Sequence, residues 1–276
     1  MFYFPGINPV KDRIIAATGA GGKTHCLEYL AQGLKELGHR VLLTTTTRIV
    51  HPGSTGFGQH IDRLIDRNIP ESLGIKPAAA TLTVAGYPDK ASGKLSGLSP
   101  ALIAALVKED IYDSILVEAD GSRGLPLKVP AGHEPVLPDE CQVVIAVTGW
   151  KGIRRALNKG IDASQVHRWQ RFSRMTGLLD GDHITPAVMG KLLGDNHGLF
   201  KNTPASARKI WLVNQVDSER DKSLATEFIQ TVTAHSIAID HCLISCFQDT
   251  SQFPVRTVSR TRNLSGRFFK NKSEGV

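Results

Sequence analysis

IIAATGAGGKTHCLEYLAQGLKELGHRVLLTTTT (residues 14–47) carries the strongest structural signal in this sequence. IIAAT (14–18) is apolar up to its last residue and is typical of a buried strand. From 24 to 37 the apolar side chains recur every three or four positions, which indicates one buried face of a helix. VLLTTTT (41–47) is rich in β-branched residues and predicts a second strand. The hydroxyls at 44–47 are either ligands for Mg²⁺, water or a substrate anion, or belong to strand-forming residues without such a role.

Between the first strand and the helix lies a turn of small residues, Gly19-Ala20-Gly21-Gly22, followed by Lys23-Thr24-His25. Glycines allow successive backbone N–H groups to point to one side, and the start of a helix adds about half a positive charge. We therefore expect all seven residues to contact a nucleotide, with Lys23 on the outer phosphates and the Thr24 hydroxyl on Mg²⁺. The usual spacing, G-x-x-x-x-G-K-[ST], would have a further glycine where this chain has Ala17. The alternative is a turn that joins a strand to a helix and binds nothing.

Two acidic residues follow the next continuous apolar run, in SILVEADG (114–121). Glu118 and Asp120 are two positions apart, so along an extended strand both side chains point to the same side. Mg²⁺ needs oxygen ligands beyond the hydroxyl of Thr24, and we expect one or both carboxylates to supply them. We also expect Asp120 to act with Lys23 in catalysis. The alternative is that both acids are solvated residues of a turn.

WLVNQVD (211–217) bears on the base that the site would bind. Asn-Lys-x-Asp after a buried strand is the guanine-reading signature of GTP-binding proteins, in which the aspartate accepts two hydrogen bonds from the base. Here Asn214 and Asp217 match the signature and Gln215 replaces its lysine. Because glutamine brings no positive charge, ATP stays open beside GTP as the nucleotide.

The segment RGLPLKVPAGHEPVLP (123–138) follows the acidic turn directly, and we expect it to change conformation with the nucleotide state. His133, beside Glu134, is a candidate for proton transfer in catalysis. If the protein instead transferred a phosphoryl group to a small molecule, Arg123, Lys128 and His133 would hold the acceptor.

The rest of the chain alternates apolar runs with helical patterns and predicts a single α/β domain over residues 1–255. Further strands are expected at 81–86, 143–149, 209–217 and 236–245. Helices are expected at 60–68, 100–107, 163–175, 186–193 and 218–234, with Ser99 as the cap of the second. We expect a helical insertion over residues 150–205 and a flexible basic tail over 256–276. The expected architecture is a three-layer sandwich of the P-loop NTPase type with a mostly parallel sheet.

The distribution of charge argues against a nucleic-acid-binding domain. Of the formal net charge of +7, the tail at 256–276 supplies +5 through six Lys or Arg and one Glu. The 4 cysteines do not make a disulfide framework in a chain of 276 residues, and the N-terminus lacks the pattern of a signal peptide. No apolar run reaches the roughly 18 residues of a membrane span. We therefore expect a cytoplasmic protein that contacts neither membrane nor nucleic acid.

A resemblance to a known family rests on four segments: TGAGGKT (18–24), LTTTTRI (43–49), LVEADGSRGLPLKVPAGHEPVLP (116–138) and LVNQVD (212–217). At these residues the chain resembles bacterial accessory proteins of selenium-dependent hydroxylases, of the YqeC type. The resemblance implies a P-loop NTPase-like fold and a nucleotide-driven role in maturing selenium-dependent molybdenum hydroxylases. An apo-hydroxylase or a molybdenum-cofactor protein would then be the partner.

The sequence thus predicts an accessory protein that binds GTP or ATP and hydrolyses it with Mg²⁺. Three other functions stay open at this point. One is a small-molecule kinase of the P-loop class, and another is a module that binds nucleotide and docks on a partner without hydrolysis. The third is a nucleic-acid binder that acts through the basic tail at 256–276.

Overall fold

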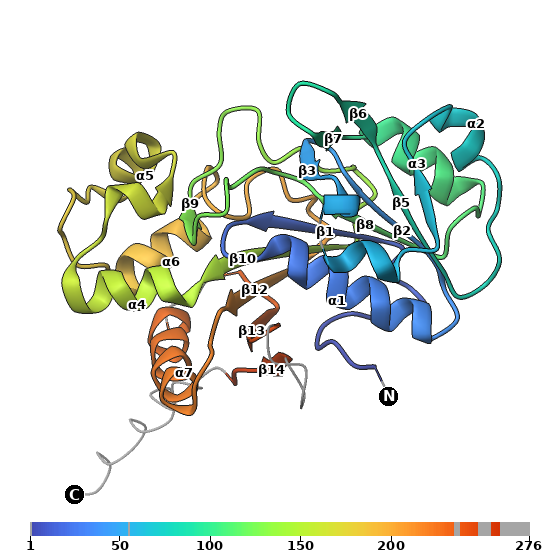
Figure 1. The fold of residues 1–276 in the computed structure, drawn as a ribbon. Coiled ribbons are helices and arrows are strands. Elements are labelled where there is room, and N and C mark those ends of the chain that lie inside the picture. Colours follow the sequence, from blue (N-terminus) through green and yellow to red (C-terminus); the bar gives the residue numbers. More distant parts are fainter. Residues whose placement is uncertain (1, 55, 235–237, 248–254, 260–276) are drawn as a thin grey trace, which may run out of the picture.

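A nine-stranded sheet forms the centre of the protein (Figure 1). The computed structural model describes residues 2–54, 56–234, 238–247 and 255–259. The strands, in the order in which they lie side by side, are β14 (Val255–Thr257), β13 (His241–Ser245), β12 (Arg208–Asn214), β10 (Val143–Gly149), β1 (Ile14–Gly19), β8 (Ser114–Glu118), β2 (Arg40–Thr45), β5 (Thr81–Ala85) and β4 (Arg63–Ile65). Neighbours run parallel except β14, which is antiparallel to β13. The predicted α/β class with a mostly parallel sheet is confirmed.

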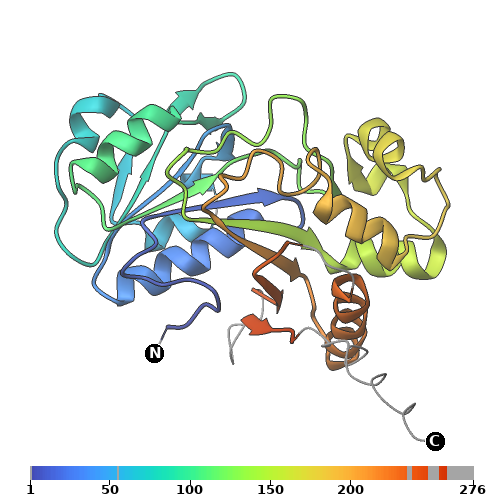
Figure 2. The ribbon, with the colours of Figure 1, turned by 180° about the vertical axis from the view of Figure 1, so that it is seen from behind.

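Helices cover both faces of this sheet and give it three layers (Figure 2). They are α1 (Lys23–Glu36), α2 (Ile69–Leu73), α3 (Pro100–Lys108), α4 (Trp150–Lys159), α5 (Trp169–Thr176), α6 (Pro186–Gly194) and α7 (Glu219–Thr233). On one face, α1 packs Leu27, Leu30 and Leu34 into a core that also contains Phe4. The other six helices contribute buried side chains to the core on the opposite face. The glycine turn therefore leads into a helix that lies alone among these seven on its face.

The central strands are buried on both faces, as their continuous apolar sequences predict. In β1, Ile14 and Ala16 belong to the core on the side of α3 and α4, whereas Ile15 and Ala17 belong to the core under α1. This alternation follows from the two-residue repeat of a strand. Packing on both faces fixes the position of β1, and therefore also the position at which the glycine turn begins.

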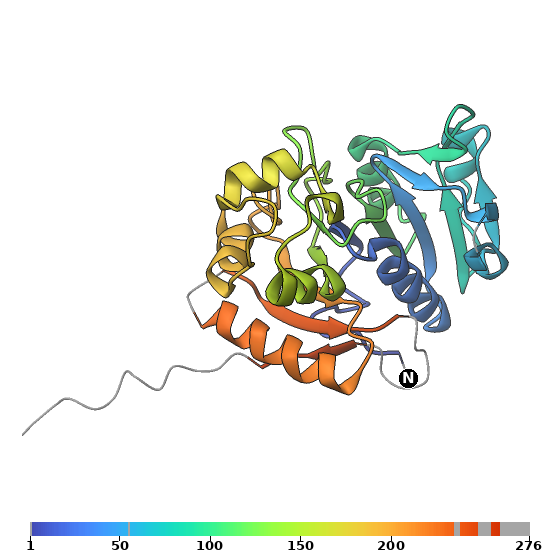
Figure 3. The ribbon, with the colours of Figure 1, turned by 60° about the vertical axis from the view of Figure 1, so that its left-hand side comes forward.

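Between β10 and β12 the chain forms α4, α5 and α6, in the region where we expected a helical insertion. Figure 3 shows these helices gathered beyond one end of the sheet, near α7. The two-residue strand β11 (Val166–His167) lies between α4 and α5 in the chain and pairs with β9 (Leu127–Lys128). The helical prediction at 163–175 therefore holds for a 3-10 turn at Ala163–Gln165 and for α5, but it is wrong at residues 166–168, which separate the two. Arg168 adopts a left-handed conformation with φ 65°, which a continuous helix excludes, and α5 begins only after it.

Beside the central sheet lies a small antiparallel sheet of β3 (Arg48–Val50), β7 (Lys94–Ser96) and β6 (Tyr87–Asp89). The helix predicted at 60–68 is also wrong, since β4 pairs with β5 there. Asp62 fixes this pairing, because its carboxylate accepts the Leu82 N–H at 2.7 Å. The apolar spacing of Ile61, Leu64 and Ile65 fits a helix as well as a strand, so contact with β5 decides the outcome.

Two predicted segments extend beyond the part of the chain that the structure describes. Residues 236 and 237 of the predicted strand 236–245 lie outside it, and β13 begins at His241. Of the predicted tail, 256–259 is described, and its first two residues belong to β14. Among the described residues, no helix combines the length and apolar character needed to cross a membrane.

Candidate functional site

The carboxyl ends of β8, β1, β10 and β12 meet at one edge of the sheet, since these strands are parallel neighbours. Ligands of open α/β sheets bind at such an edge. The residues that follow these strands open onto a cavity of about 700 Å³. Most of the residues predicted to bind nucleotide or metal line it: Gly22, Lys23, Thr24, His25, Glu118, Asn214 and Asp217. One cavity thus brings together groups from three distant parts of the sequence.

The glycine turn packs so closely against its surroundings that side chains would not fit. Gly22 has φ 119°, and a Cβ atom there would lie 2.2 Å from Asn214 Nδ2. Gly21 has φ 85°, and its Cβ would lie 2.3 Å from the Gly149 backbone N. Both positions need glycine for conformation and for space. Glycine at these two positions therefore lets the turn pack closely against Asn214 and Gly149.

Asn214 holds this turn in place. Its Nδ2 donates a hydrogen bond to the Gly21 carbonyl at 2.8 Å, and its Oδ1 accepts one from Ser245 at 3.0 Å. The sequence predicted that Asn214 reads the base together with Asp217. In the structure the Asn214 side chain lines the cavity and joins the ends of β12 and β13 to the turn.

Three of the turn's amides are already paired within the protein. The N–H groups of Gly19, Ala20 and Gly21 donate to Asp120 Oδ2 (3.0 Å), the Val147 carbonyl (2.9 Å) and the Leu125 carbonyl (3.0 Å), respectively. This differs from the expectation that all amides from 19 to 24 face a ligand. The donors left for an anion are those at the start of α1, because the first N–H groups of a helix have no partner within it.

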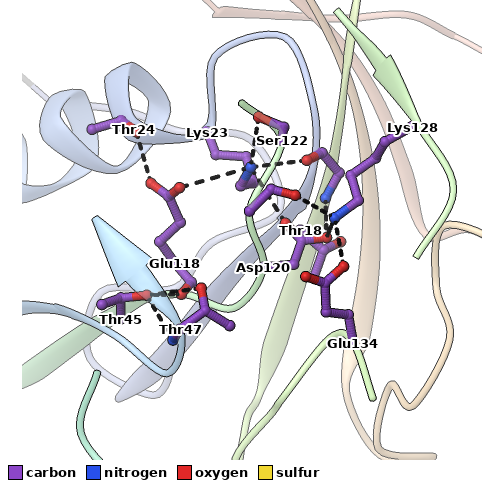
Figure 4. Close-up of polar contacts among 12 residues, drawn as sticks. Thr18, Lys23, Thr24, Thr45, Thr47, Glu118, Asp120, Ser122, Lys128 and Glu134 are labelled. Carbon is purple, nitrogen blue, oxygen red and sulfur yellow. Dashed lines mark hydrogen bonds and ion pairs between the residues drawn. The ribbon is translucent and has the colours of Figure 1, made fainter. Parts of the chain in front are cut away.

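Lys23 is buried beneath this helix start, with 3% of its surface exposed. Its Nζ donates to the Gly19 carbonyl at 2.9 Å and lies 3.3 Å from Asp120 Oδ1 and 3.7 Å from Glu118 Oε1 (Figure 4). Burial alone would lower the pKa of Lys23, but Asp120 and Glu118 outweigh it and raise the pKa. The side chain therefore carries its positive charge at neutral pH.

Thr24 and Glu118 offer oxygen ligands side by side, since the Thr24 hydroxyl donates to Glu118 Oε2 at 2.7 Å. Among the described residues no cluster of three or more His, Cys, Asp or Glu could hold a metal ion by itself. A hard oxygen pair of this kind fits Mg²⁺ when phosphate oxygens and water complete the shell. Asp120 fits less well, because its carboxylate is fully buried between Lys23 and Lys128. The geometry thus favours Glu118 as the carboxylate beside the metal.

The threonines at and just after the end of β2 form hydrogen bonds with backbone carbonyls of neighbouring segments. The hydroxyls of Thr44, Thr45 and Thr46 donate to the carbonyls of Ala85 (2.8 Å), Glu118 (2.6 Å) and Val136 (2.7 Å). Of the two interpretations left open by the sequence, these contacts favour the structural one.

A chain of ion pairs continues from Lys23 into the segment at 123–138. Asp120 Oδ2 lies 2.8 Å from Lys128 Nζ, which lies 3.1 Å from Glu134 Oε2 (Figure 4). Glu134 Oε1 in turn accepts a hydrogen bond from Arg168 at 3.0 Å. Burial would raise the pKa of Glu134, but Lys128 and Arg168 lower it to about 2. The segment is thus fastened by charge to the base of the site.

We expect the Glu134→Gln variant to lose less stability in acid than the unchanged protein. The folded-state pKa of about 2 lies below the ordinary 4.5, so this carboxylate stabilises the fold above pH 4.5, and the contribution is lost as the pH falls toward 2. Urea denaturation between about pH 5 and pH 3 measures the effect as a shallower fall of the unfolding free energy. Glu140→Gln, at an exposed position, should keep the steep fall. If the unfolding free energy fell equally steeply with pH in Glu134→Gln and in the unchanged protein, the lowered pKa of Glu134 would be contradicted.

An acidic and an aromatic residue also line the cavity. Asp217 lines it and is held by Lys151, whose Nζ lies 2.7 Å from Asp217 Oδ2. Phe247 also lines it, and its ring centroid lies 5.4 Å from that of Tyr29. An aromatic face beside a carboxylate can stack a base and accept hydrogen bonds from its edge.

Sequence reasoning missed several residues of the cavity and misplaced one. Arg48 and Lys94 line it from β3 and β7, and Ser122 and Phe247 complete it. Arg48 follows a strand end directly, which could have marked it, but nothing in the sequence pairs it with Lys94. His133, a predicted catalytic residue, is exposed and is not among the residues that line the cavity.

Comparisons with known proteins agree with the resemblance noted in the sequence. A family model described as YqeC protein matches residues 15–170 of the chain. A relative from Escherichia coli (strain K12), named Uncharacterized protein YqeC, is 35% identical over 228 residues, which is 82% of this chain and 85% of the relative. No solved structure matches the chain. The region matched by the family model includes the glycine turn and both acids and ends before Asn214 and Asp217.

Proposed function

We propose that this chain, which belongs to the YqeC protein family, binds a nucleoside triphosphate and hydrolyses it with Mg²⁺. The observation that carries the proposal is the arrangement at the start of α1. There Lys23 and Thr24 line one cavity with Glu118, and the Thr24 hydroxyl lies 2.7 Å from the Glu118 carboxylate. A buried ammonium, a helix start and a hydroxyl–carboxylate pair are the groups that phosphates and their Mg²⁺ require.

In this proposal the chain contributes position and charge. The amides at the start of α1 bind the phosphates and Lys23 neutralises them, with Arg123 adding charge from the opposite wall. Mg²⁺, when bound by Thr24 and Glu118, would stabilise negative charge on the phosphates. Arg48 and Lys94, on the small sheet, would exclude water from the cavity and add positive charge.

Asp217 is the residue that would select the base, since Asn214 is engaged with the Gly21 carbonyl. A carboxylate accepts hydrogen bonds from two donors on guanine, and adenine lacks this pair of donors. Guanine is therefore the base that this wall of the cavity suits better, with Phe247 beside it.

Calorimetric titration of Mg²⁺-GTP and Mg²⁺-ATP, with phosphate release measured in parallel, tests the proposal. We expect the unchanged protein to bind GTP more tightly, and Asp217→Asn to reduce that affinity at least about tenfold, because the amide replaces one acceptor by a donor. Asp139→Asn, at an exposed position outside the cavity, should leave both affinities unchanged. Absence of binding to either nucleotide would refute the proposal, and binding without phosphate release would indicate a docking module.

The kinase alternative has less support. Of the three residues that would hold a phosphoryl acceptor, Arg123 lines the cavity, but Lys128 is buried in ion pairs and His133 lies outside the lining. These positions give a phosphoryl-acceptor site less support than the hydrolysis proposed above. We propose further that hydrolysis serves the maturation of selenium-dependent molybdenum hydroxylases, which rests on the family resemblance alone.

A further inference from the structure

A second cavity, of about 390 Å³, lies between the loop at 129–132 and the helices α5 and α6. Its charged lining residues are Arg171, Arg174, Lys191, Lys201 and Asp195. Four cations thus face one carboxylate, and concave walls concentrate the field of like charges. We propose that this cavity binds the phosphate group of a small molecule, independently of the nucleotide site proposed above.

The positive groups in this cavity are not neutralised by the fold. Within the described ranges, the side chains of Arg171, Arg174 and Lys191 make no hydrogen bond or ion pair. This contrasts with arginines nearby: Arg154 pairs with Asp221 at 2.8 Å and Arg155 with Asp162 at 3.0 Å. Three unpaired cations in one concave site favour an anion from outside the chain.

Asp195 offsets only part of this charge, since one carboxylate lies among four cations. Its Oδ1 accepts a hydrogen bond from the His197 N–H at 2.7 Å, which holds the carboxylate on its own backbone. Lys201 donates to the Ala131 carbonyl at 2.8 Å, and it thereby fixes the loop that forms the opposite wall. The loop at 129–132 is consequently fixed beside the cavity, and the lining keeps a net positive charge.

The geometry fits phosphate better than a simple point anion. Arg171 and Arg174 are three residues apart, so they lie on one face of α5, and guanidinium forks match phosphate oxygens in pairs. Arg168, one turn earlier, is anchored on Glu134 at 3.0 Å, which holds the start of the helix against the loop. The arginine pair is therefore presented by a helix that is already fixed.

The size of the cavity and its apolar part indicate a small molecule. A volume of about 390 Å³ lies in the range of small-molecule sites and is too small for a nucleic-acid duplex. Val129, Pro130 and Met175 line it beside the charged residues. We infer a ligand with a phosphate at one end and a compact, partly apolar body.

Titration of inorganic pyrophosphate into the full-length chain tests this site. The Lys23→Met variant, which disables the nucleotide site, should still bind pyrophosphate, and adding Arg171→Ala and Arg174→Ala should weaken that binding at least tenfold. Adding Arg67→Ala and Arg220→Ala instead, two exposed arginines outside both cavities, removes the same charge and should change it less than twofold.

Three results would overturn the inference. They are no pyrophosphate binding by the folded Lys23→Met chain, equal effects of the two arginine pairs, and tighter binding of a single-stranded oligonucleotide than of pyrophosphate at these arginines. If Lys23→Met does not fold, the same comparison is made in the unchanged chain. There Arg171→Ala with Arg174→Ala should remove one of two binding events, and the persistence of both would equally reject the site.

Discussion

Replacing Lys23 by Met should weaken the binding of Mg²⁺-nucleotide at least about 100-fold, or about 2.7 kcal/mol. Lys23 Nζ lies 3.3 Å from Asp120 and 3.7 Å from Glu118, and it keeps its positive charge because these carboxylates raise its pKa. Methionine fills much of the same space without the charge. The variant therefore loses an attraction to the phosphates, and Glu118 loses its positive neighbour beside them while Asp120 keeps only Lys128, so that the site attracts the ligand less.

Lys35→Met is the matched control for this measurement. Lys35 lies at the other end of the same helix and is also ion-paired, with Asp62 at 2.7 Å. Its replacement should leave nucleotide affinity unchanged while removing an equal charge from the helix. Thermal melting establishes that Lys23→Met is folded before calorimetry. If it is not, Thr24→Val, which removes the hydroxyl bound to Glu118, should lower Mg²⁺-dependent affinity about tenfold. Unchanged affinity in a folded Lys23→Met protein would remove the basis of the proposed function.

The parts of the fold that could be predicted are those where local pattern and tertiary contact agree. The apolar runs of β1, β8 and β10 are buried on both faces, and the stripe on α1 packs as its spacing indicates. At α3, the Ser99 side chain accepts the Leu102 N–H, as its capping position predicts. These signals act within a few residues and need no knowledge of the rest of the chain.

The errors arose where a partner distant in sequence decides the structure. Within the segment 60–68, residues 63–65 form the edge strand β4, which pairs with β5. Within the segment 163–175, residues 166–167 form β11, which pairs with β9 almost forty residues earlier in the chain. Short apolar spacings fit both periods, so only the tertiary contact distinguishes them.

At the site, too, roles set by local sequence could be predicted, whereas roles set by contacts between distant residues could not. The sequence placed Lys23, Thr24 and Glu118 in one site because strand order and glycine chemistry are general properties of such turns. It could not show that Asn214 would be used to hold the turn, since that contact spans 193 residues. Nor could it show that Lys128 would lie between two carboxylates rather than face a ligand.

Lys128→Met should cost about 3–5 kcal/mol of folding stability, the usual effect of removing one partner from a buried ion-pair network. The Lys128 side chain is fully buried, lies 2.8 Å from Asp120 and 3.1 Å from Glu134, and donates to the Gly121 carbonyl at 2.7 Å. Methionine matches its volume but leaves both carboxylates with less positive charge nearby. Urea denaturation at neutral pH measures the loss.

A second substitution distinguishes this network from a simple packing effect. In Lys128→Met with Glu134→Gln, one of the uncompensated charges is gone, so the double variant should be less destabilised than the sum of the two single variants. Lys222→Met removes a lysine paired with Glu219 on the partly exposed face of α7, and it should cost no more than about 0.5 kcal/mol. Strict additivity, or a loss below about 1 kcal/mol in Lys128→Met, would mean that the carboxylates are stabilised by other groups and that the ion-pair chain does not hold the segment at 123–138.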